Sequence, residues 1–235
     1  MRVLVFDTET SGLPPKRFHN NVTEQNVNMW PHTAQFSYVV YNTYTDSVET
    51  LEDTIVKVPK HIVLNGDSEK IHGITNEMSA HQGVDIEVVL RKFIRHLESV
   101  DQVVGHNIEF DLNMVRAECY RLMCNVERAH HFKDDYLAFL SKLSTTPCYC
   151  TMQANVERCN IVAVSPKGKT YVKWPTLQEL HVELFHCVPS NLHNSLVDVI
   201  VCLRCYCKIL RDVDVASTCI IVKKILDQDA SSASV

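Results

Sequence analysis

No apolar run of the 235-residue sequence approaches the roughly 20 residues that a membrane-spanning helix needs. A secretory leader is also lacking, because Met1 leads directly into a strand-like segment rather than into the basic and then apolar region of a signal peptide. We therefore expect an intracellular protein, in the cytoplasm or the nucleus, that makes no contact with a membrane.

Positive charge is not in excess either, because 23 lysines and arginines stand against 28 aspartates and glutamates, for a formal net charge of −5. No overall positive field attracts a polyanion to this chain. Any site that handles phosphate therefore has to be built locally, and metal ions are the natural source of its positive charge.

Cysteine is absent before Cys119, and pairs such as Cys148/Cys150 are too close in sequence to staple a fold. We expect reduced thiols rather than a disulfide framework. Cys202, Cys205 and Cys207 resemble a metal motif, but on a continuous helix Cys207 lies roughly 140° around the axis from Cys202. The three thiols therefore do not close on one zinc ion, and buried free cysteines are expected.

Composition and length indicate one globular domain, since 46% of the residues are hydrophobic and 22% are charged. No internal repeat or low-complexity block interrupts the chain. We assign residues 1–228 to a single domain and residues 229–235, which are small and polar, to a flexible C-terminal tail.

Apolar periodicity predicts the order of strands and helices that is typical of an α/β domain. Strands are expected at residues 3–6, 33–43, 48–58, 102–107 and 148–152, and helices at 85–98, 109–123, 176–185 and 194–210. Residues 14–31 and 64–79 are expected as loops, the second with a short helix at 67–71; residues 125–146 as partly helical; and residues 165–174 as a hairpin. The fold class is therefore α/β, a mixed sheet flanked by helices, in which ligands bind beyond the carboxyl ends of the strands.

The segment "VLVFDTETSGL" (3–13) ends a buried strand with two acids, Asp7 and Glu9. Alternate residues of a strand point to the same face, so the two carboxylates lie about 6 to 7 Å apart along the chain. Two like charges so placed raise each other's pKa unless a cation neutralises them. Taken alone, the pair is better explained as a solvated strand end, so a functional site requires that further acids converge.

Two further acids are candidates for that convergence. Asp111 falls in the first turn of a predicted helix, where the helix dipole alone explains a carboxylate. Asp198 lies among apolar neighbours on a predicted buried helix, where an unpaired carboxylate is costly. His193 reaches the same place as Asp198 only if it precedes the helix, which requires that Asn194 or Ser195 be the N-cap.

Three segments together resemble the exonuclease motifs of the histidine subgroup (DEDDh, or DnaQ-like) of the DEDD 3′-to-5′ exonucleases: "FDTETSGLP", "VGHNIEFDLNMV" and "HNSLVDV". Linking segments also resemble this group, among them "IHGIT", "WPHTAQFSYV" and "KWPTLQELHVELF". The resemblance extends from Met1 to about Leu210. It implies a ribonuclease-H-like fold with a five-stranded mixed sheet flanked by helices.

The resemblance also implies a site and a reaction. The site has five members: Asp7, Glu9, Asp111 and Asp198 as carboxylates that hold two Mg²⁺ or Mn²⁺ ions, and His193 as general base. Asp7 is expected to bridge both ions, Glu9 and Asp198 to hold the one that activates water, and Asp111 to position the other. The reaction removes nucleoside 5′-monophosphates from single-stranded or frayed DNA 3′ ends, in repair, proofreading or degradation.

Substrate-binding residues follow from the same motifs. The expected set is Thr10, Ser11, Gly12 and Leu13 for the terminal nucleotide, His72 and Ile74 for its sugar, and Asn107 and Phe110 lining the cleft. A helix cap remains open for Asn107, and a core position for Phe110. Ser195 departs from the alanine that the family often carries, and a capping role is expected for its hydroxyl.

Several alternatives stay open from the sequence. An RNA-trimming 3′-to-5′ exoribonuclease would carry the same motifs, and a non-catalytic module that binds nucleic acid or a polymerase is the alternative of another class. Lys167, Lys169 and Lys173 either guide a single strand or form a solvated face. The segment "CIIVKKIL" (219–226) is expected to pack on the core rather than to form a homodimer contact.

Overall fold

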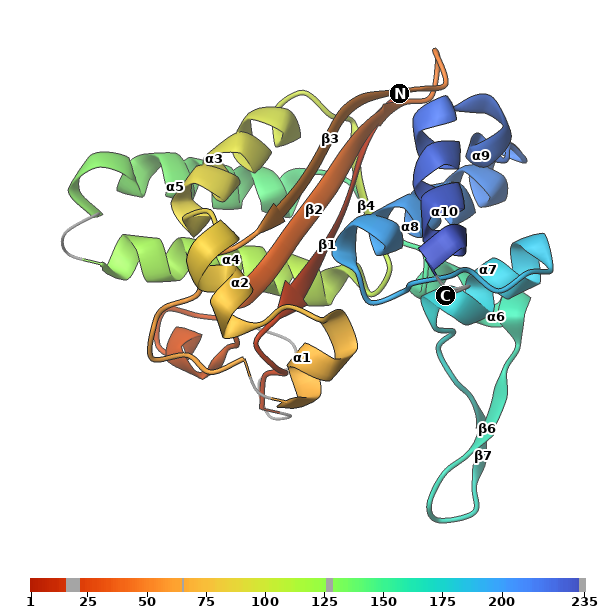
Figure 1. Cartoon of the computed structure of the whole chain (residues 1–235), viewed down its shortest axis with the longest axis horizontal. Helices are drawn as coiled ribbons and strands as arrows, with labels where there is room; N and C mark the ends of the chain where they lie inside the picture. The colour runs from red at the N-terminus through yellow and green to blue at the C-terminus, as the bar shows by residue number, and fades with distance from the viewer. Residues whose placement is uncertain (16–21, 65, 126–128, 233–235) are drawn as a thin grey trace.

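The computed structural model of the chain describes residues 1–15, 22–64, 66–125 and 129–232 (Figure 1). Its centre is a five-stranded sheet in the order β3-β2-β1-β4-β5. The strands are β1 (Arg2–Thr10), β2 (Thr33–Asn42), β3 (Ser47–Ile55), β4 (Gln102–Gly105) and β5 (Cys148–Cys150). β1 pairs antiparallel with β2 and parallel with β4, and β4 pairs parallel with β5. The predicted fold class, a mixed five-stranded sheet flanked by helices, is confirmed.

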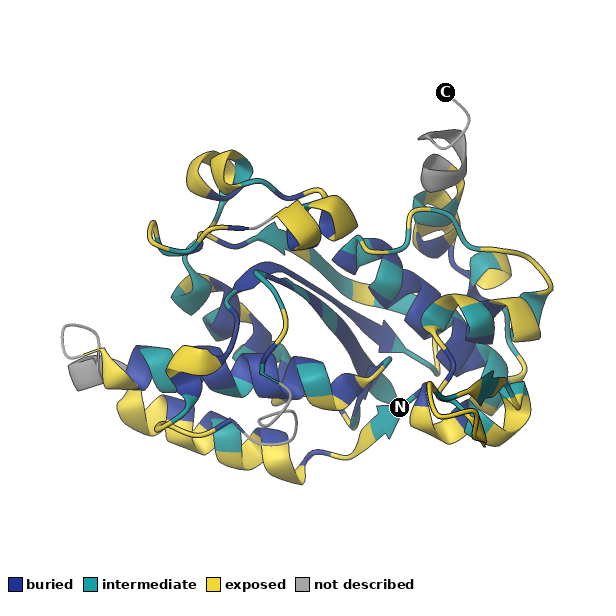
Figure 2. Cartoon of the chain, turned by 90° about the horizontal axis from the view of Figure 1, so that it is seen from below, coloured by how far each residue is buried: buried dark blue, intermediate teal, exposed yellow. Residues whose placement is uncertain are grey.

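Strand β1 divides its side chains between two layers of helices. Leu4 and Phe6 belong to the core on one face of the sheet, and Val3 and Val5 belong to the core on the other. All four side chains are at most 1% exposed, so residues 3–6 of the strand are apolar without interruption although they alternate in direction. Figure 2 shows this burial along the sheet and on the inner faces of the helices.

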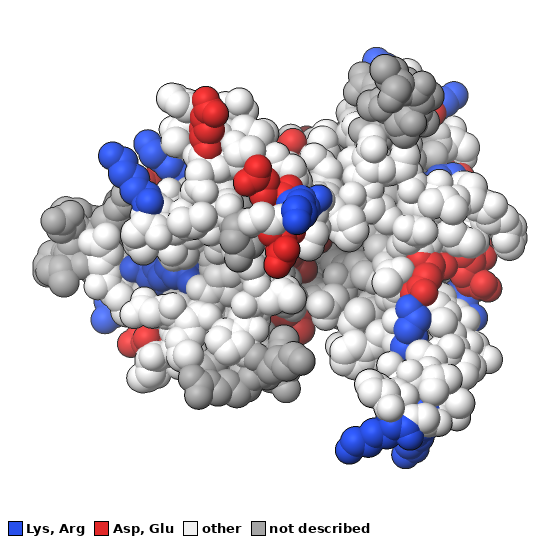
Figure 3. Space-filling model, turned by 60° about the horizontal axis from the view of Figure 1, so that its bottom comes forward, with Lys and Arg blue, Asp and Glu red and all other residues white. Residues whose placement is uncertain are grey.

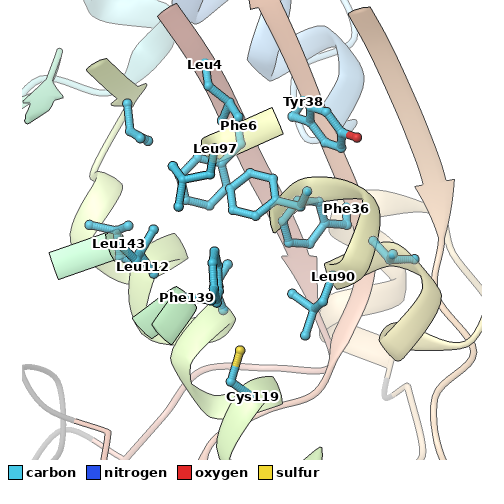
Figure 4. Packing of buried hydrophobic residues seen from close by; sticks show 14 of the residues in the cluster. Leu4, Phe6, Phe36, Tyr38, Leu90, Leu97, Leu112, Cys119, Phe139 and Leu143 are labelled. Carbon is cyan, nitrogen blue, oxygen red and sulfur yellow. The ribbon is translucent and has the colours of Figure 1, made fainter. Parts of the chain in front are cut away.

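The Leu4 and Phe6 face is covered by α3 (Ile86–Leu97), α4 (Ile108–Cys124) and α5 (Ala129–Thr145). Aromatic rings fill its centre, among them those of Phe6 and Phe36 (Figure 4). Phe93 from α3 lies 5.1 Å from Phe6 and 5.0 Å from Phe36, centroid to centroid. These tilted and edge-on arrangements are the preferred ones for aromatic pairs. The helices expected at 85–98 and 109–123 are therefore present, and the partly helical region 125–146 contains α5.

The opposite face is covered by α8 (Ser195–Arg211), α9 (Val215–Thr218) and α10 (Ile220–Ser232), with α7 (Leu177–Phe185) packed on α8. Cys219 and Val222 are buried in this core, so the prediction that residues 219–226 pack on the body of the protein is confirmed. α9 and α10 were not predicted. α10 continues to Ser232, where a tail was expected from residue 229; residues 233–235 lie outside the described part.

Both expected loops contain helical turns. α1 (Gly66–His72) matches the predicted short helix, but α2 (Asn76–Gln82), which the Thr75 side chain caps, lies in the part of 64–79 that was expected as a loop. η2 (Val27–Met29) lies in the loop 14–31, of which residues 16–21 are outside the described part. After β5 come η3 (Gln153–Asn155), α6 (Val156–Cys159) and the hairpin of β6 (Val162–Val164) and β7 (Thr170–Val172).

All ten cysteines are free, as predicted. Cys202, Cys205 and Cys207 are buried on α8, and burial is the main reason why the pKa of Cys205 and of Cys207 rises to about 12. None of the three belongs to a group of metal-ligating side chains among the described residues. No helix in the described ranges is both long and apolar enough to cross a membrane.

Candidate active site

Strand β1 and helix α8 bring three carboxylates together at one point. Oxygen atoms of Asp7, Glu9 and Asp198 all lie within 4.8 Å of one another. Asp7 and Glu9 follow Val3 and Val5 in the alternation of β1, so they face α8. Asp198 is in the first turn of that helix. The structure therefore brings together three of the four acids expected to hold metal.

The fourth acid, Asp111, is held from the other face of the same strand. Its Oδ1 accepts hydrogen bonds from the backbone N–H of Thr8, at 3.0 Å, and from the Thr8 hydroxyl, at 2.7 Å. Thr8 lies between Asp7 and Glu9 and points to the side covered by α4, which carries Asp111 in its first turn. Asp111 is 2% exposed, and its charge is a main cause, after burial, of the raised pKa of Asp7.

Asp198 has one oxygen bonded and one without a partner. Its Oδ2 accepts a hydrogen bond of 3.1 Å from the backbone N–H of His193. Its Oδ1 is buried, and no hydrogen-bond donor among the described residues reaches it. A buried carboxylate oxygen without a partner is costly, and a cation is the group that relieves this cost in an all-carboxylate cluster.

The four carboxyl groups have raised pKa values. Burial raises the pKa of Asp111 and of Asp198 to about 7 and that of Glu9 to about 8. For Asp7 the pKa rises well above its usual value, first through burial and then through the charges of Asp111, Asp198 and Glu9. The mutual repulsion expected from the sequence is therefore present, and these residues fit divalent cations bound by oxygen ligands.

His193 lies immediately outside α8, as its predicted role requires. The Asn194 side chain caps the helix by accepting from the N–H groups of Leu196 and Val197, at 3.1 and 3.4 Å. His193 has a positive φ of 74° and is exposed, and no described residue hydrogen-bonds to its ring. Its backbone is joined to Asp198, while its imidazole remains accessible to solvent.

Ser195 does not cap α8, so that expectation is wrong. Its side chain is fully buried, and its hydroxyl donates a hydrogen bond of 2.8 Å to the backbone carbonyl of Asp7. Asn194 occupies the N-cap instead, because its longer amide reaches the N–H groups of the first turn. The Ser195 hydroxyl is thereby left to join α8 to β1.

A polar network behind the carboxylates was missed from the sequence. Gln35 on β2 accepts from the Ser195 N–H through Oε1, at 3.4 Å, and donates from Nε2 to Asp53 Oδ1, at 2.7 Å. The Ser37 hydroxyl donates to the same Asp53 oxygen at 2.7 Å. Gln35 and Ser37 are buried polar residues two apart in an otherwise apolar strand; this spacing was the available signal.

The loop after β1 has a fixed backbone. The Thr10 hydroxyl donates to the Gly12 carbonyl at 2.7 Å. The Ser11 N–H donates to the His32 carbonyl at 2.8 Å, and the Ser11 hydroxyl accepts from the His32 N–H at 2.9 Å. Gly12 has a φ of 153°, which residues with a side chain rarely adopt. Leu13 is 79% exposed. An apolar side chain and an open backbone thus lie beside the carboxylates.

His72 and Ile74 support this loop from behind. His72 Nδ1 accepts from the Ile74 N–H at 3.1 Å, so the proton of the neutral ring lies on Nε2, which bonds the Thr10 carbonyl at 3.2 Å. Burial lowers the pKa of His72 and favours this neutral form. Ile74 is 3% exposed and packs beside Ala34. The structure therefore places Ile74 in the core, with little surface free for a sugar.

Asn107 and Phe110 lie at the start of α4. Asn107 occupies the N-cap position with a φ of 63°, yet its side chain makes no capping hydrogen bond and is exposed. Phe110 is half-buried and packs on the cluster that contains Trp30. His106 is structural, since its ring bonds the Thr151 hydroxyl and the Pro175 carbonyl.

The architecture and the acidic cluster together define a class, the ribonuclease-H-like α/β proteins. Residues 4–206 match the family RNase_T, described as Exonuclease, and the chain belongs to this family. The match runs from β1 into α8 and includes every acid of the site. The family is one of exonucleases, hydrolases of phosphodiester bonds.

Solved structures of similar fold include Exonuclease I from Methylocaldum szegediense, at 17% identity over 91% of this chain and 42% of that one, with a TM-score of 0.57. E. coli Exonuclease I in complex with a dT13 oligonucleotide has 15% identity over 88% of this chain and 41% of that one, with a TM-score of 0.57. The complex of the same enzyme with a dA16 oligonucleotide has 16% identity, coverage of 90% and 41%, and a TM-score of 0.57.

The chain thus spans about two fifths of the length of these Exonuclease I structures. Their likeness establishes the fold, in agreement with the family match. A comparison with curated protein sequences gave no match.

Proposed function

We propose that this protein is a metal-dependent 3′-to-5′ exonuclease of the histidine (DEDDh) subgroup, which removes nucleoside 5′-monophosphates from single-stranded or frayed DNA ends. The observation that carries the proposal is the convergence of Asp7, Glu9 and Asp198 on one point, with a buried Asp198 oxygen that no described residue satisfies. A purely structural acid on α8 would be hydrogen-bonded through both oxygens.

The cations are assigned to the carboxylates by their position. Glu9, Asp198 and Asp7 would hold one ion, and Asp111, which reaches β1 from its opposite face, would hold the other together with Asp7. The donors are all oxygens, which favours Mg²⁺ or Mn²⁺. When bound, two such ions stabilise the charge that develops on the attacking and leaving oxygens of an in-line phosphoryl displacement.

His193 is assigned the role of general base. Its ring is accessible, it precedes α8, and its peptide N–H is bonded to Asp198, so the backbone that carries the imidazole is held beside the carboxylate cluster. A neutral imidazole takes a proton from the attacking water at a pH near neutrality. The same N–H bond holds Asp198 in place while the ring acts.

The terminal nucleotide is assigned to the loop of residues 10–13. Leu13 offers an exposed apolar surface to a base, and Gly12 leaves space for close approach of the backbone. Asn107, whose exposed side chain is not used as a cap, is assigned to the same cleft. Support for a DNA substrate comes from the similar Exonuclease I structures that hold dT13 and dA16 oligonucleotides.

The test is digestion of matched 5′-labelled single-stranded DNA and RNA with Mg²⁺, with Mn²⁺ and with EDTA. We expect a ladder that shortens from the 3′ end of DNA, requires a divalent cation and is abolished in Asp198→Asn. Asp212→Asn is the matched control, because Asp212 is an exposed acid at the other end of α8 with a φ of 54°, which asparagine tolerates.

Each other outcome contradicts a part of the proposal. A ladder on RNA alone would assign the protein to RNA trimming. A ladder that persists in EDTA and in Asp198→Asn would exclude the carboxylates as its source. Binding of DNA without any ladder would leave the protein as a non-catalytic module.

A further inference from the structure

The hairpin of β6 and β7, with its flanking residues 161–174, projects from the body of the protein; we call it the β6–β7 arm. Its two strands pair only with each other and form a sheet of their own. In Figure 1 the arm extends on the side of the molecule towards which β1 points, the end that carries Asp7 and Glu9. The proposed exonuclease site does not use it.

The arm carries apolar and aromatic side chains that are exposed to solvent, whereas side chains of these types are mostly buried elsewhere in the fold. Val162 and Val164 are 63% and 65% exposed, and Tyr171 and Trp174 are 51% and 60% exposed. A single two-stranded hairpin is marginally stable in water without a packed face. Two aromatic residues and several valines on such a ribbon indicate that a ligand covers it.

The base of the arm is joined to the active-site region. His106, one residue before the N-cap of α4, bonds the Pro175 carbonyl through Nε2 at 3.0 Å and lies 2.9 Å from the Thr151 hydroxyl through Nδ1. Lys173 at the end of the arm forms an ion pair of 2.6 Å with Glu179 on α7. α7 packs on α8, which carries Asp198. The arm therefore begins at elements that hold the carboxylates.

Positive charge lies at the free end of the arm. Lys167 and Lys169 flank Gly168, whose φ of 77° closes the turn, and both are exposed. Neither forms an ion pair with any residue in the described ranges, and Figure 3 shows the resulting basic surface at the end of the arm. Strand alternation places Lys169, Tyr171 and Lys173 on one face, since Tyr171 pairs with Ala163 and Lys173 N–H bonds the Ile161 carbonyl.

We propose that the β6–β7 arm binds the backbone of a single strand of nucleic acid upstream of the nucleotide being removed. Lys167 and Lys169 contact phosphates, and Tyr171 stacks on a base between them, the combination by which single strands are bound without sequence preference. In a chain of net charge −5, the arm supplies locally the attraction that the protein as a whole lacks. The inference rests on the proposed function, which brings a strand to this site.

The test compares wild type with Lys167→Glu/Lys169→Glu and with Tyr171→Ala. Fluorescence anisotropy measures affinity for dT30 and rU30 in EDTA, and hydrolysis is followed on p-nitrophenyl thymidine 5′-monophosphate, which is too small to reach the arm. In both variants we expect about tenfold weaker binding of dT30 and hydrolysis of the small ester unchanged within about twofold. In Lys167→Glu/Lys169→Glu the slope of log affinity against log salt should also be smaller by about 1.4, the value for two lost phosphate contacts, whereas Tyr171→Ala should leave this slope unchanged.

Lys223→Glu/Lys224→Glu is the matched control, because it makes the same change of net charge on exposed lysines of α10. Equal loss of affinity in this control, or unchanged dT30 affinity in the arm variants, overturns the proposal. A third outcome also overturns it: wild type is a dimer, the arm variants are monomers, and their affinity for dT30 is unchanged. In that case a second copy of the chain, and not a nucleic acid, covers the arm. If wild type hydrolyses no substrate, the proposed function fails, and the anisotropy still decides whether the arm binds a strand.

Discussion

The hydroxyl of Ser195 donates a hydrogen bond of 2.8 Å to the backbone carbonyl of Asp7. This bond joins the first residue of α8 directly to the strand that carries two of the carboxylates. Asp198 and His193 lie within three residues of Ser195 along the chain, so the distance between the acids of β1 and those of α8 depends on it.

Two substitutions at Ser195 distinguish the effect of losing its hydrogen bond from the effect of overfilling its buried position. Ser195→Ala loses one buried bond, and we expect the free energy of unfolding to fall by about 1 kcal/mol with little loss of turnover. Ser195→Leu overfills a fully buried position and pushes α8 from β1, so turnover should fall at least tenfold. Urea unfolding and the oligonucleotide ladder measure the two effects. Ser217→Ala, which removes an exposed bond to the Asp214 carbonyl, is the control; equal destabilisation there would contradict this account.

Gln35 is expected to act as a positioning residue. Gln35→Leu leaves the buried Ser195 N–H without its partner, which costs about 1 to 3 kcal/mol, and removes one of the two donors to the exposed Asp53. We expect a lower kcat and a higher Mg²⁺ concentration for half-maximal activity, with KM for DNA unchanged, because the residue touches α8 and not the substrate loop. A change in KM alone would contradict a positioning role.

His193→Ala is expected to lower turnover by about 10² to 10⁴, the contribution of a general base. Binding of Mn²⁺ should persist, because the four carboxylates and the backbone N–H of residue 193 remain. Steady-state kinetics and Mn²⁺ titration by electron paramagnetic resonance check the two parts. His186→Ala is a matched control, since His186 is also exposed with a positive φ, of 57°, at a helix end. Unchanged turnover in His193→Ala would remove this residue from the mechanism.

Stability without divalent cations should decrease as pH rises. The folded pKa values of about 7 for Asp111 and Asp198 and about 8 for Glu9 lie above the ordinary value near 4. Between about pH 4 and pH 8 the native state holds more protons than the unfolded state. The contribution of this cluster to the free energy of unfolding is therefore complete below about pH 4 and is lost progressively as the pH rises to about 8.

Thermal unfolding with and without Mg²⁺ tests this expectation. Mg²⁺ should raise Tm more at pH 8 than at pH 5, because it binds ionised carboxylates. Asp198→Asn should unfold at a higher temperature than wild type in EDTA at pH 8, since one repelling charge is removed, whereas Asp212→Asn should not. An increase of Tm with Mg²⁺ that is the same at both pH values would exclude the cluster as the binding site.

The sequence was sufficient where local pattern decides the structure. The alternation of β1 predicted that Asp7 and Glu9 share a face, and an N-cap at either Asn194 or Ser195 predicted that His193 precedes the helix; the structure places the cap at Asn194. It was insufficient where contacts join distant elements: nothing near Gln35 identifies Asp53 or Ser195 as its partners. α2 was missed because seven residues carry too little periodicity to distinguish a helix from a loop. Assignments of substrate contacts to residues 10–13, Asn107 and Phe110 remain predictions.

The core beneath α10 includes residues that lie beyond the end of the family match. The family match ends at residue 206, yet Val215, Cys219 and Val222 lie in the same core as Val3 and Val5 of β1. A protein cut after residue 206 would open this apolar layer to water beside β1. The minimal stable fragment therefore extends well beyond the segment that the family match covers, and the additional helices form an integral wall of the domain rather than an appendage.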